Sequence, residues 1–168
     1  STRQSASEPQ DVDIEGIPVR RALLAYPLRW RAYLSLYHPR ADAAVAAFLG
    51  HVCPDIVHAH NIHTYLTYHS FALARWRHVP VVLTTHDVMP VTYQKFEDFI
   101  PEMIRTGRVD YRVHALKDFA RHRLRYFPLR NAIIRSQIGR HVDLLISPSR
   151  ALLEVFAANG VAAAHNVC

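Results

Sequence analysis

VPVVLTTH, residues 79–86, decides the fold class of this chain, because its apolar residues stand at consecutive positions instead of alternating ones. A strand that is hydrophobic on both faces is typical of a parallel sheet covered by helices. Two further runs, DIVHAH at 55–60 and VDLLISPS at 142–149, are rich in aliphatic and β-branched residues and are also predicted strands. One sheet that holds all three strands is therefore expected.

Segments with helical periodicity separate these strands. Helices are predicted at 41–52, 64–76, 112–127, 129–142 and 150–160. With GIPVRRALL at 16–24 as a further candidate, strands of the sheet are expected near 17–24, 55–60, 80–86 and 143–147. Strands that alternate with helices form parallel sheets, so the predicted fold class is α/β, with a Rossmann-like parallel sheet flanked by helices.

The chain has 168 residues, half of them hydrophobic, which is enough for one domain with its own core. Residues 1–15 are polar and featureless and are expected to be a disordered or cut N-terminal segment, while 16–168 form the domain. Because the chain begins without Met and stops where a further strand is expected, a fragment of a larger protein is predicted.

Three features of the sequence bear on localisation. No apolar run reaches the roughly 18 residues that a membrane span needs, and no signal peptide is visible. The two cysteines, Cys53 and Cys168, are far apart and indicate no disulfide framework. A reducing, cytoplasmic environment is therefore expected.

The net charge of +6 is concentrated in residues 105–140, which hold ten of the twenty Lys and Arg residues and only two acidic residues. Such a patch fits nucleic acid, anionic lipid headgroups or phosphorylated substrates. A solvated helical face explains the same pattern without a partner. Charge alone does not decide between these alternatives.

Polar side chains follow the predicted strands where each one ends. His58 and His60 close one strand, His86 closes the next and Ser147 closes a third. Because the carboxyl ends of parallel strands meet at one edge of a sheet, where ligands collect, these side chains are expected to lie close together. His63 follows at the start of the next predicted helix, where backbone N–H groups favour anions.

These stretches resemble the N-terminal domain of the retaining glycosyltransferases of family 4, whose GT-B fold has two Rossmann-like domains facing a cleft. PDIVHAHNIH at 54–63, VPVVLTTHDVMP at 79–90 and VDLLISPSRALLEVFAANGV at 142–161 carry the resemblance. The family's N-terminal strand with its Gly-rich loop has no counterpart in the sequence, and neither has the Glu-x7-Glu segment that holds the nucleotide sugar.

The resemblance implies that the chain is the acceptor-side half of a hexosyltransferase. The complete enzyme would move a sugar from a nucleotide-sugar donor to a hydroxyl of a glycan or lipid-linked acceptor, with retention. The isolated half would be inactive, because the donor-binding residues would lie in the second domain.

The resemblance also implies roles for the rim residues. His86 would contact the acceptor or the phosphate of the transferring sugar, and Asp87 would orient His86 or bind a sugar hydroxyl. His63 matches a histidine that touches the donor sugar in related GT-B enzymes. Further substrate-binding candidates are His60, Asn61 and Thr85. Alternatively, His86 caps its strand by binding backbone, and Asp87 only forms a turn.

A metal site and a phosphate site are two other interpretations of the polar rim. Zinc needs three or four convergent ligands, yet no CxxC or HExxH pattern is present. The resemblance implies no metal and no cofactor, since the nucleotide sugar is a substrate. We expect His58 in the core, His60 at the cleft, and Ser147 or Ser149 as a helix cap rather than a phosphate ligand.

A basic binding module is the alternative from a different functional class. Nucleic-acid binding would need arginines along one face with aromatic side chains for stacking, but no nucleic-acid motif is recognisable. The glycosyltransferase is therefore preferred, and no nucleic acid is expected as a partner. The basic helices at 112–140 would then dock on an anionic membrane surface, at the inner face of the membrane.

Overall fold

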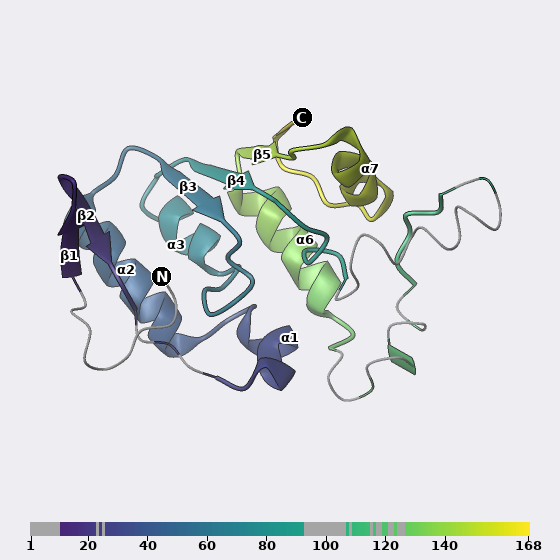
Figure 1. Ribbon diagram of the computed structural model, residues 1–168, viewed down its shortest axis with the longest axis horizontal. Helices are drawn as coiled ribbons and strands as arrows, with labels where there is room; N and C mark the ends of the chain where they lie inside the picture. Colours follow the sequence, from purple (N-terminus) through teal and green to yellow (C-terminus); the bar gives the residue numbers. More distant parts are fainter. Residues whose placement is uncertain are drawn as a thin grey trace.

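The computed structural model describes residues 11–92 apart from 23 and 25, residues 127–168, and between these 107, 109–114, 116, 119, 120 and 123. A four-stranded parallel sheet in the order β3-β4-β5-β6 forms the centre of the domain (Figure 1). Its strands are β3 (Val57–His60), β4 (Val81–Thr84), β5 (Leu144–Ile146) and β6 (His165–Val167). The α/β, Rossmann-like class predicted from the sequence is confirmed.

The register of the sheet brings the strand ends to one edge. A single row of paired residues crosses the sheet, through His60, Thr84, Ile146 and Val167. Because all four strands are parallel, every residue that follows this row leaves the sheet at the same edge. The expectation that the polar strand ends share one rim is therefore confirmed.

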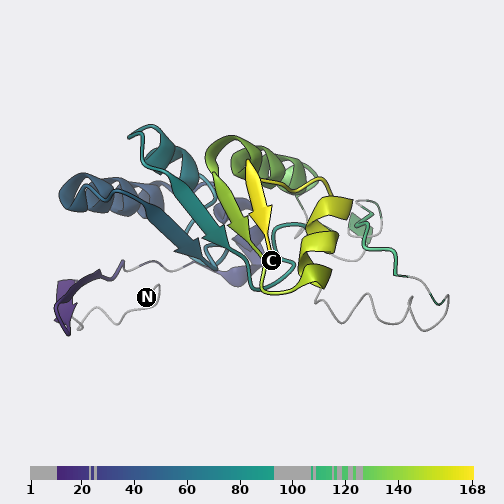
Figure 2. The same cartoon turned by 90° about the horizontal axis from the view of Figure 1, so that it is seen from above.

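Helices cover one face of the sheet. Figures 1 and 2 show α2 (Pro39–Val52), α3 (Ser70–Arg75) and α6 (Arg130–His141) side by side along this face, and α7 (Arg150–Ala158) connects β5 to β6. The core between the layers is built from fully or almost fully buried side chains, among them Phe71, Val81, Ile134, Ile138, Leu145 and Phe156. In β4 the consecutive apolar residues are buried as predicted.

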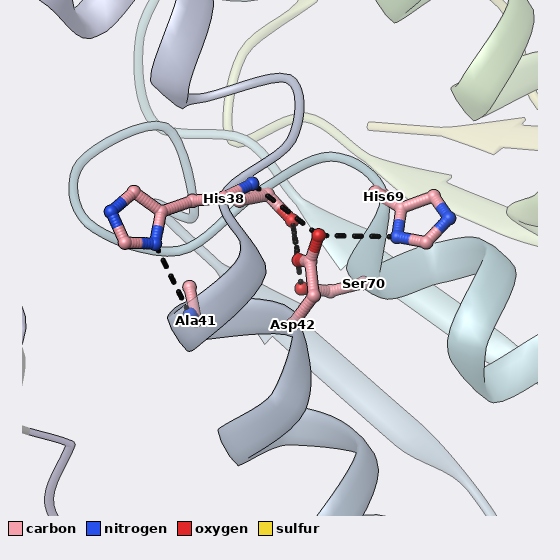
Figure 3. Close-up of polar contacts among 6 residues, drawn as sticks. His38, Ala41, Asp42, His69 and Ser70 are labelled. Carbon is pink, nitrogen blue, oxygen red and sulfur yellow. Dashed lines mark hydrogen bonds and ion pairs between the residues drawn. The ribbon is translucent and has the colours of Figure 1, made fainter.

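A buried polar node joins the start of α2 to the start of α3 (Figure 3). The ring of His38 caps α2, because its Nδ1 accepts a hydrogen bond from the backbone N–H of Ala41. Asp42, which is buried, accepts hydrogen bonds from the His38 N–H and the Thr67 hydroxyl, and lies 3.3 Å from His69 Nδ1. The carboxylate thereby holds together two segments that are distant in the sequence.

The caps of α7 follow the sequence prediction. Ser149 Oγ accepts a hydrogen bond from the Leu152 N–H, so Ser149 is the N-cap and Ser147 is not. Gly160 follows the C-cap with φ of 68°, a left-handed conformation that glycine adopts without steric cost. The helices predicted at 41–52, 129–142 and 150–160 are confirmed.

The strand predicted at 17–24 is present at Ile17–Arg20 (β2) but does not belong to the parallel sheet. It pairs in antiparallel fashion with β1 (Asp11–Ile14), in a segment that was expected to be disordered. The turn between them is the reason, since Glu15 and Gly16 both have positive φ, as two-residue hairpin turns require. An ion pair between Arg20 and Asp11, 2.7 Å apart, closes the hairpin.

The helix predicted at 64–76 is shorter than expected. Tyr65 has φ of 69°, which interrupts any helix, and its N–H donates to the Tyr26 hydroxyl instead. The loop before α3 is thus fixed to the segment that carries η1 (Leu28–Trp30) and α1 (Arg31–Leu34).

The segment predicted as a helix at 112–127 is only partly described. Residues 112–114 are irregular, and most of the rest lies outside the described residues.

Among the described residues, no helix combines the length and the apolarity needed to cross a bilayer.

Candidate functional site

Two loops at the carboxyl edge of the sheet carry the predicted site residues. The first follows β3 and the second follows β4, and together they surround a small hollow. The predicted residues that line this hollow are Asn61, His63, Thr85, His86 and Asp87. The hollow has room for about 10 Å³, which is about one water molecule. A ligand larger than a water molecule would therefore have to lie over this surface.

His60 and His86 form a side-chain pair above this edge. His60 Nδ1 lies 3.1 Å from His86 Nε2, and the two rings are stacked with an interplanar angle of 22°. His58 lies beside them, with its ring centroid 4.2 Å from that of His60 and its Nε2 2.8 Å from Thr84 Oγ1. The expectation that His58 belongs to the core is wrong, because the alternation along β3 places it with His60 on the face away from the helices.

The His60–His86 contact requires that one nitrogen carries a hydrogen and the other does not. Burial lowers the pKa of His60, and the nearby His58 and His86 lower it further. At neutral pH the ring of His60 is therefore uncharged. A pair of this kind can donate a hydrogen bond to an oxyanion or accept one from a hydroxyl.

His63 and Asp87 form the second pair of the site. His63 Nε2 lies 3.3 Å from Asp87 Oδ2, and the side chain of His63 is 14% exposed while that of Asp87 is 42% exposed. The other oxygen of Asp87 accepts a hydrogen bond from the Met89 N–H at 2.9 Å. The structure therefore places Asp87 against His63 rather than His86, and the carboxylate also closes a turn.

The charge state of His63 is set by opposing neighbours. Burial is the largest effect and lowers its pKa, Asp87 raises it, and Arg31 and Arg130 lower it again. The net direction is downward, so His63 is neutral at neutral pH. A carboxylate has no hydrogen to donate, so this contact favours the tautomer with the hydrogen on Nε2, which leaves Nδ1 as the acceptor.

The two remaining candidates differ in their environment. Asn61 is exposed, with φ of 46°, and turns the chain out of β3. Thr85 is buried, and its hydroxyl donates to the Ile146 carbonyl at 3.2 Å and lies 3.4 Å from Ser147 Oγ. The hydroxyl of Thr85 therefore ties the ends of β4 and β5 together.

Arg130 and Asn131 support the second loop and were not among the predicted site residues. Arg130 is fully buried, and its Nη2 donates to the Met89 carbonyl at 2.8 Å. The side-chain amide of Asn131 donates to the Val91 carbonyl. The sequence contained a signal for this position, because Arg130 and Asn131 lie at the start of the helix predicted at 129–142. Arg130 was nevertheless counted only as part of the basic patch.

The basic segment is only partly described. Within the described part of 105–140, the exposed arginines are Arg112, Arg123, Arg135 and Arg140. Leu116, which lies in the segment predicted as a helix at 112–127, is 84% exposed, whereas Val113 and Phe127 pack against the core. Next to Phe127, the rings of Tyr33 and Trp30 form a chain of contacts that ends at the surface.

No metal site is evident in the described part of the chain, where no three His, Cys, Asp or Glu residues converge on one point.

Comparison with known proteins gave one match. A family model described as Glycosyltransferase Family 4 matches residues 2–167, which include both loops of the site. No curated protein and no solved structure matches the chain.

Proposed function

Since the chain belongs to glycosyltransferase family 4 and has the fold of its N-terminal GT-B domain, we propose that it forms the acceptor side of a retaining hexosyltransferase. The donor would be a nucleotide sugar and the acceptor a hydroxyl group of a glycan or a lipid-linked glycan. The observation that carries this proposal is the pairing of His63 with Asp87 beside His60 and His86, at the carboxyl edge of the sheet.

In such a transfer, the bond between the anomeric carbon and the donor phosphate breaks and the acceptor oxygen forms a new bond to that carbon. His63 would orient the acceptor, because its Nδ1 can accept a hydrogen bond from the attacking hydroxyl while Asp87 fixes the ring through Nε2. The proton of that hydroxyl would pass to the departing phosphate. The His60–His86 pair would donate a hydrogen bond to the oxygen that gains charge as the phosphate leaves. Asn61, exposed beside them, would bind a sugar hydroxyl.

The donor would be bound mainly by residues outside this sequence. Its 168 residues contain no Glu-x7-Glu segment, and the hollow at the sheet edge is too small to hold a nucleotide. We therefore propose that the chain by itself neither binds the donor tightly nor transfers sugar. The transfer would need no metal and no cofactor.

A cytoplasmic enzyme with a lipid-linked acceptor would work at the inner face of a membrane. The exposed arginines of the basic segment and the exposed Trp30 and Leu129 support this placement. Arginine is attracted to anionic headgroups, and tryptophan favours the boundary between headgroups and acyl chains. The nucleic-acid alternative is not supported, since Tyr111 and Phe127 pack against the core instead of offering free faces for bases.

The test uses a complete enzyme that contains this domain. A panel of nucleotide sugars is offered with and without lipid-linked acceptors, and release of the nucleotide and labelling of the acceptor are both measured. His63→Gln should lower kcat by about 10² or more, the scale of one positioned polar group in a transition state. His78→Gln, at an exposed site beyond α3, is the control. Absence of transfer and hydrolysis with every donor, or full activity of a folded His63→Gln variant, would refute the proposal.

A further inference from the structure

Arg130, the first residue of α6, occupies a position that is unfavourable for a cation in three respects. It is 0% exposed, although arginine is rarely buried completely. Its charge has lost the solvation of water, which costs several kcal/mol before partners compensate. It also lies in the first turn of a helix, where the helix dipole repels positive charge. Such local conflicts are expected mainly at functional sites.

The contacts of Arg130 point to the loop that carries Asp87. Arg130 Nη2 donates to the Met89 carbonyl at 2.8 Å, and Nη1 donates to Asn131 Oδ1 at 3.1 Å. Asn131 in turn donates to the Val91 carbonyl. Two neighbouring residues of α6 thus hold two carbonyls of this loop, and one of these belongs to Met89, whose N–H binds the Asp87 carboxylate.

Arg130 also acts on His63 through its charge. The charged groups that shift the pKa of His63 are Asp87 from the loop after β4, Arg31 from α1 and Arg130 from α6. Asp87 favours a protonated ring, and the two arginines oppose it. The guanidinium of Arg130 therefore counteracts the carboxylate that the same guanidinium helps to position.

We propose that Arg130 is a positioning residue of the site: it fixes the loop that holds Asp87 against His63. The result is a ring with a fixed tautomer, whose Nδ1 stays available as an acceptor. Only the identity of the hydroxyl that Nδ1 would meet rests on the proposed transferase function. The positioning itself is a property of this chain.

Two substitutions of Arg130 separate its charge from its hydrogen bonds. Arg130→Gln removes the charge and, because its side chain is shorter, also the hydrogen bond to the Met89 carbonyl. Arg130→Lys retains the charge but cannot donate to the Met89 carbonyl and to Asn131 Oδ1 with the geometry of a guanidinium group. Arg135→Gln, at an exposed position of the same helix, is the matched control. The readout is the titration and tautomer of His63, measured by imidazole nitrogen NMR on the chain without any substrate.

The titration midpoint of His63 should rise in Arg130→Gln and stay close to the wild-type midpoint in Arg130→Lys and Arg135→Gln. In Arg130→Lys the amide of Met89 should exchange faster with solvent, because its loop is less firmly held. In the complete enzyme, Arg130→Gln should lower kcat by up to about 10²-fold, the cost of a misplaced catalytic group, and should move the acid limb of the pH–rate profile upward. A role in the fold alone would not move that limb.

An unchanged His63 tautomer together with unchanged exchange of the Met89 amide in the folded Arg130 variants would overturn the proposal. Should both Arg130 variants fail to fold, Asn131→Ala decides, since it removes the hydrogen bond to the Val91 carbonyl and the acceptor of Arg130 Nη1 but leaves Arg130 in place. Asn131→Ala should speed exchange in the loop and mix the two tautomers of His63, and an unchanged tautomer would overturn the proposal. Because none of these NMR measurements needs a substrate, failure to find a sugar transfer would count against the proposed function and leave the positioning role intact.

Discussion

Asp87→Asn removes one negative charge from the site and leaves the side-chain shape and the oxygen that binds the Met89 N–H. Asp87 Oδ2 lies 3.3 Å from His63 Nε2. When His63 is protonated, two unit charges at this distance interact by about 5 kcal/mol at an effective dielectric constant of 20 and by about 1 kcal/mol in water. Because Asp87 is 42% exposed, solvent screens the pair, and we expect the lower value, about 1 kcal/mol.

Two consequences should be measurable in Asp87→Asn. The pKa of His63 should fall further, because burial, Arg31 and Arg130 then act without opposition. The preference for the tautomer with hydrogen on Nε2 should weaken, since an amide can present either its oxygen or its nitrogen to the ring. If transfer depends on this tautomer, kcat should fall about fivefold or more, which corresponds to about 1 kcal/mol.

The assay combines NMR titration of His63 with steady-state kinetics of the complete enzyme. Asp55→Asn, at an exposed position before β3, is the control for a general loss of negative charge. A rise in the pKa of His63, or an unchanged tautomer together with an unchanged rate in a folded variant, would refute the reasoning. Asp87 would then serve only to close the turn with Met89.

Four further predictions follow from the described contacts. Asp42→Ala should lower the free energy of unfolding by about 3 kcal/mol, because it leaves the donors of Thr67 and His38 without their acceptor. Urea denaturation measures this change, and a smaller decrease than in Asp55→Ala would contradict the role of the polar node. His86→Ala should reduce transfer by about 10²-fold in the complete enzyme while the domain stays folded, and wild-type activity would reduce His86 to a partner of His60. The free energy of unfolding should decrease as the pH falls below about 6.5, because His63 and His141 have lowered pKa values in the folded state and the unfolded chain therefore binds protons first. His63→Gln should weaken this pH dependence. An unchanged pH dependence would contradict the argument that burial lowers the pKa of His63. The chain should sediment with anionic vesicles in low salt and be released near 0.5 M salt, where the Debye length is about 4 Å, and Trp30→Ala should weaken binding; equal binding to neutral vesicles would exclude an electrostatic attachment.

The sequence was sufficient to predict those parts of the fold that depend on local patterns. The consecutive apolar residues of Val81–Thr84 required a buried parallel strand, and the serine before Arg150–Ala158 required a helix cap. Since parallel strands share a direction, their polar ends had to meet at one edge, as the pairing of His60 with His86 shows.

The sequence was not sufficient where tertiary contacts override local preference. Nothing in the residues around Tyr65 shows that a hydroxyl of Tyr26, far away in the chain, would fix a left-handed turn there. The sequence also did not show which histidine Asp87 would contact. Asp87 follows His86 directly, yet its carboxylate contacts His63 from another loop. Likewise, an arginine at the start of an amphipathic helix is expected in solvent, and only the packing of α6 against the loop after β4 buries Arg130.

The order of the strands has a consequence for how the chain acquires its structure during synthesis. Because β3, β4, β5 and β6 neighbour one another in the order in which they leave the ribosome, each new strand can pair with an edge that is already in place. The connection from β4 to β5, between Thr84 and Leu144, is by far the longest, and closing it costs about 1 kcal/mol more than closing the connection from β3 to β4. β3 and β4 can therefore be paired before β5 has been made, and Arg130 and Asn131 reach the loop after Asp87 only when α6 docks. The geometry of the site is completed by that docking step. Newly made chains would therefore acquire the fixed orientation of the His63 ring only after β3 and β4 have paired.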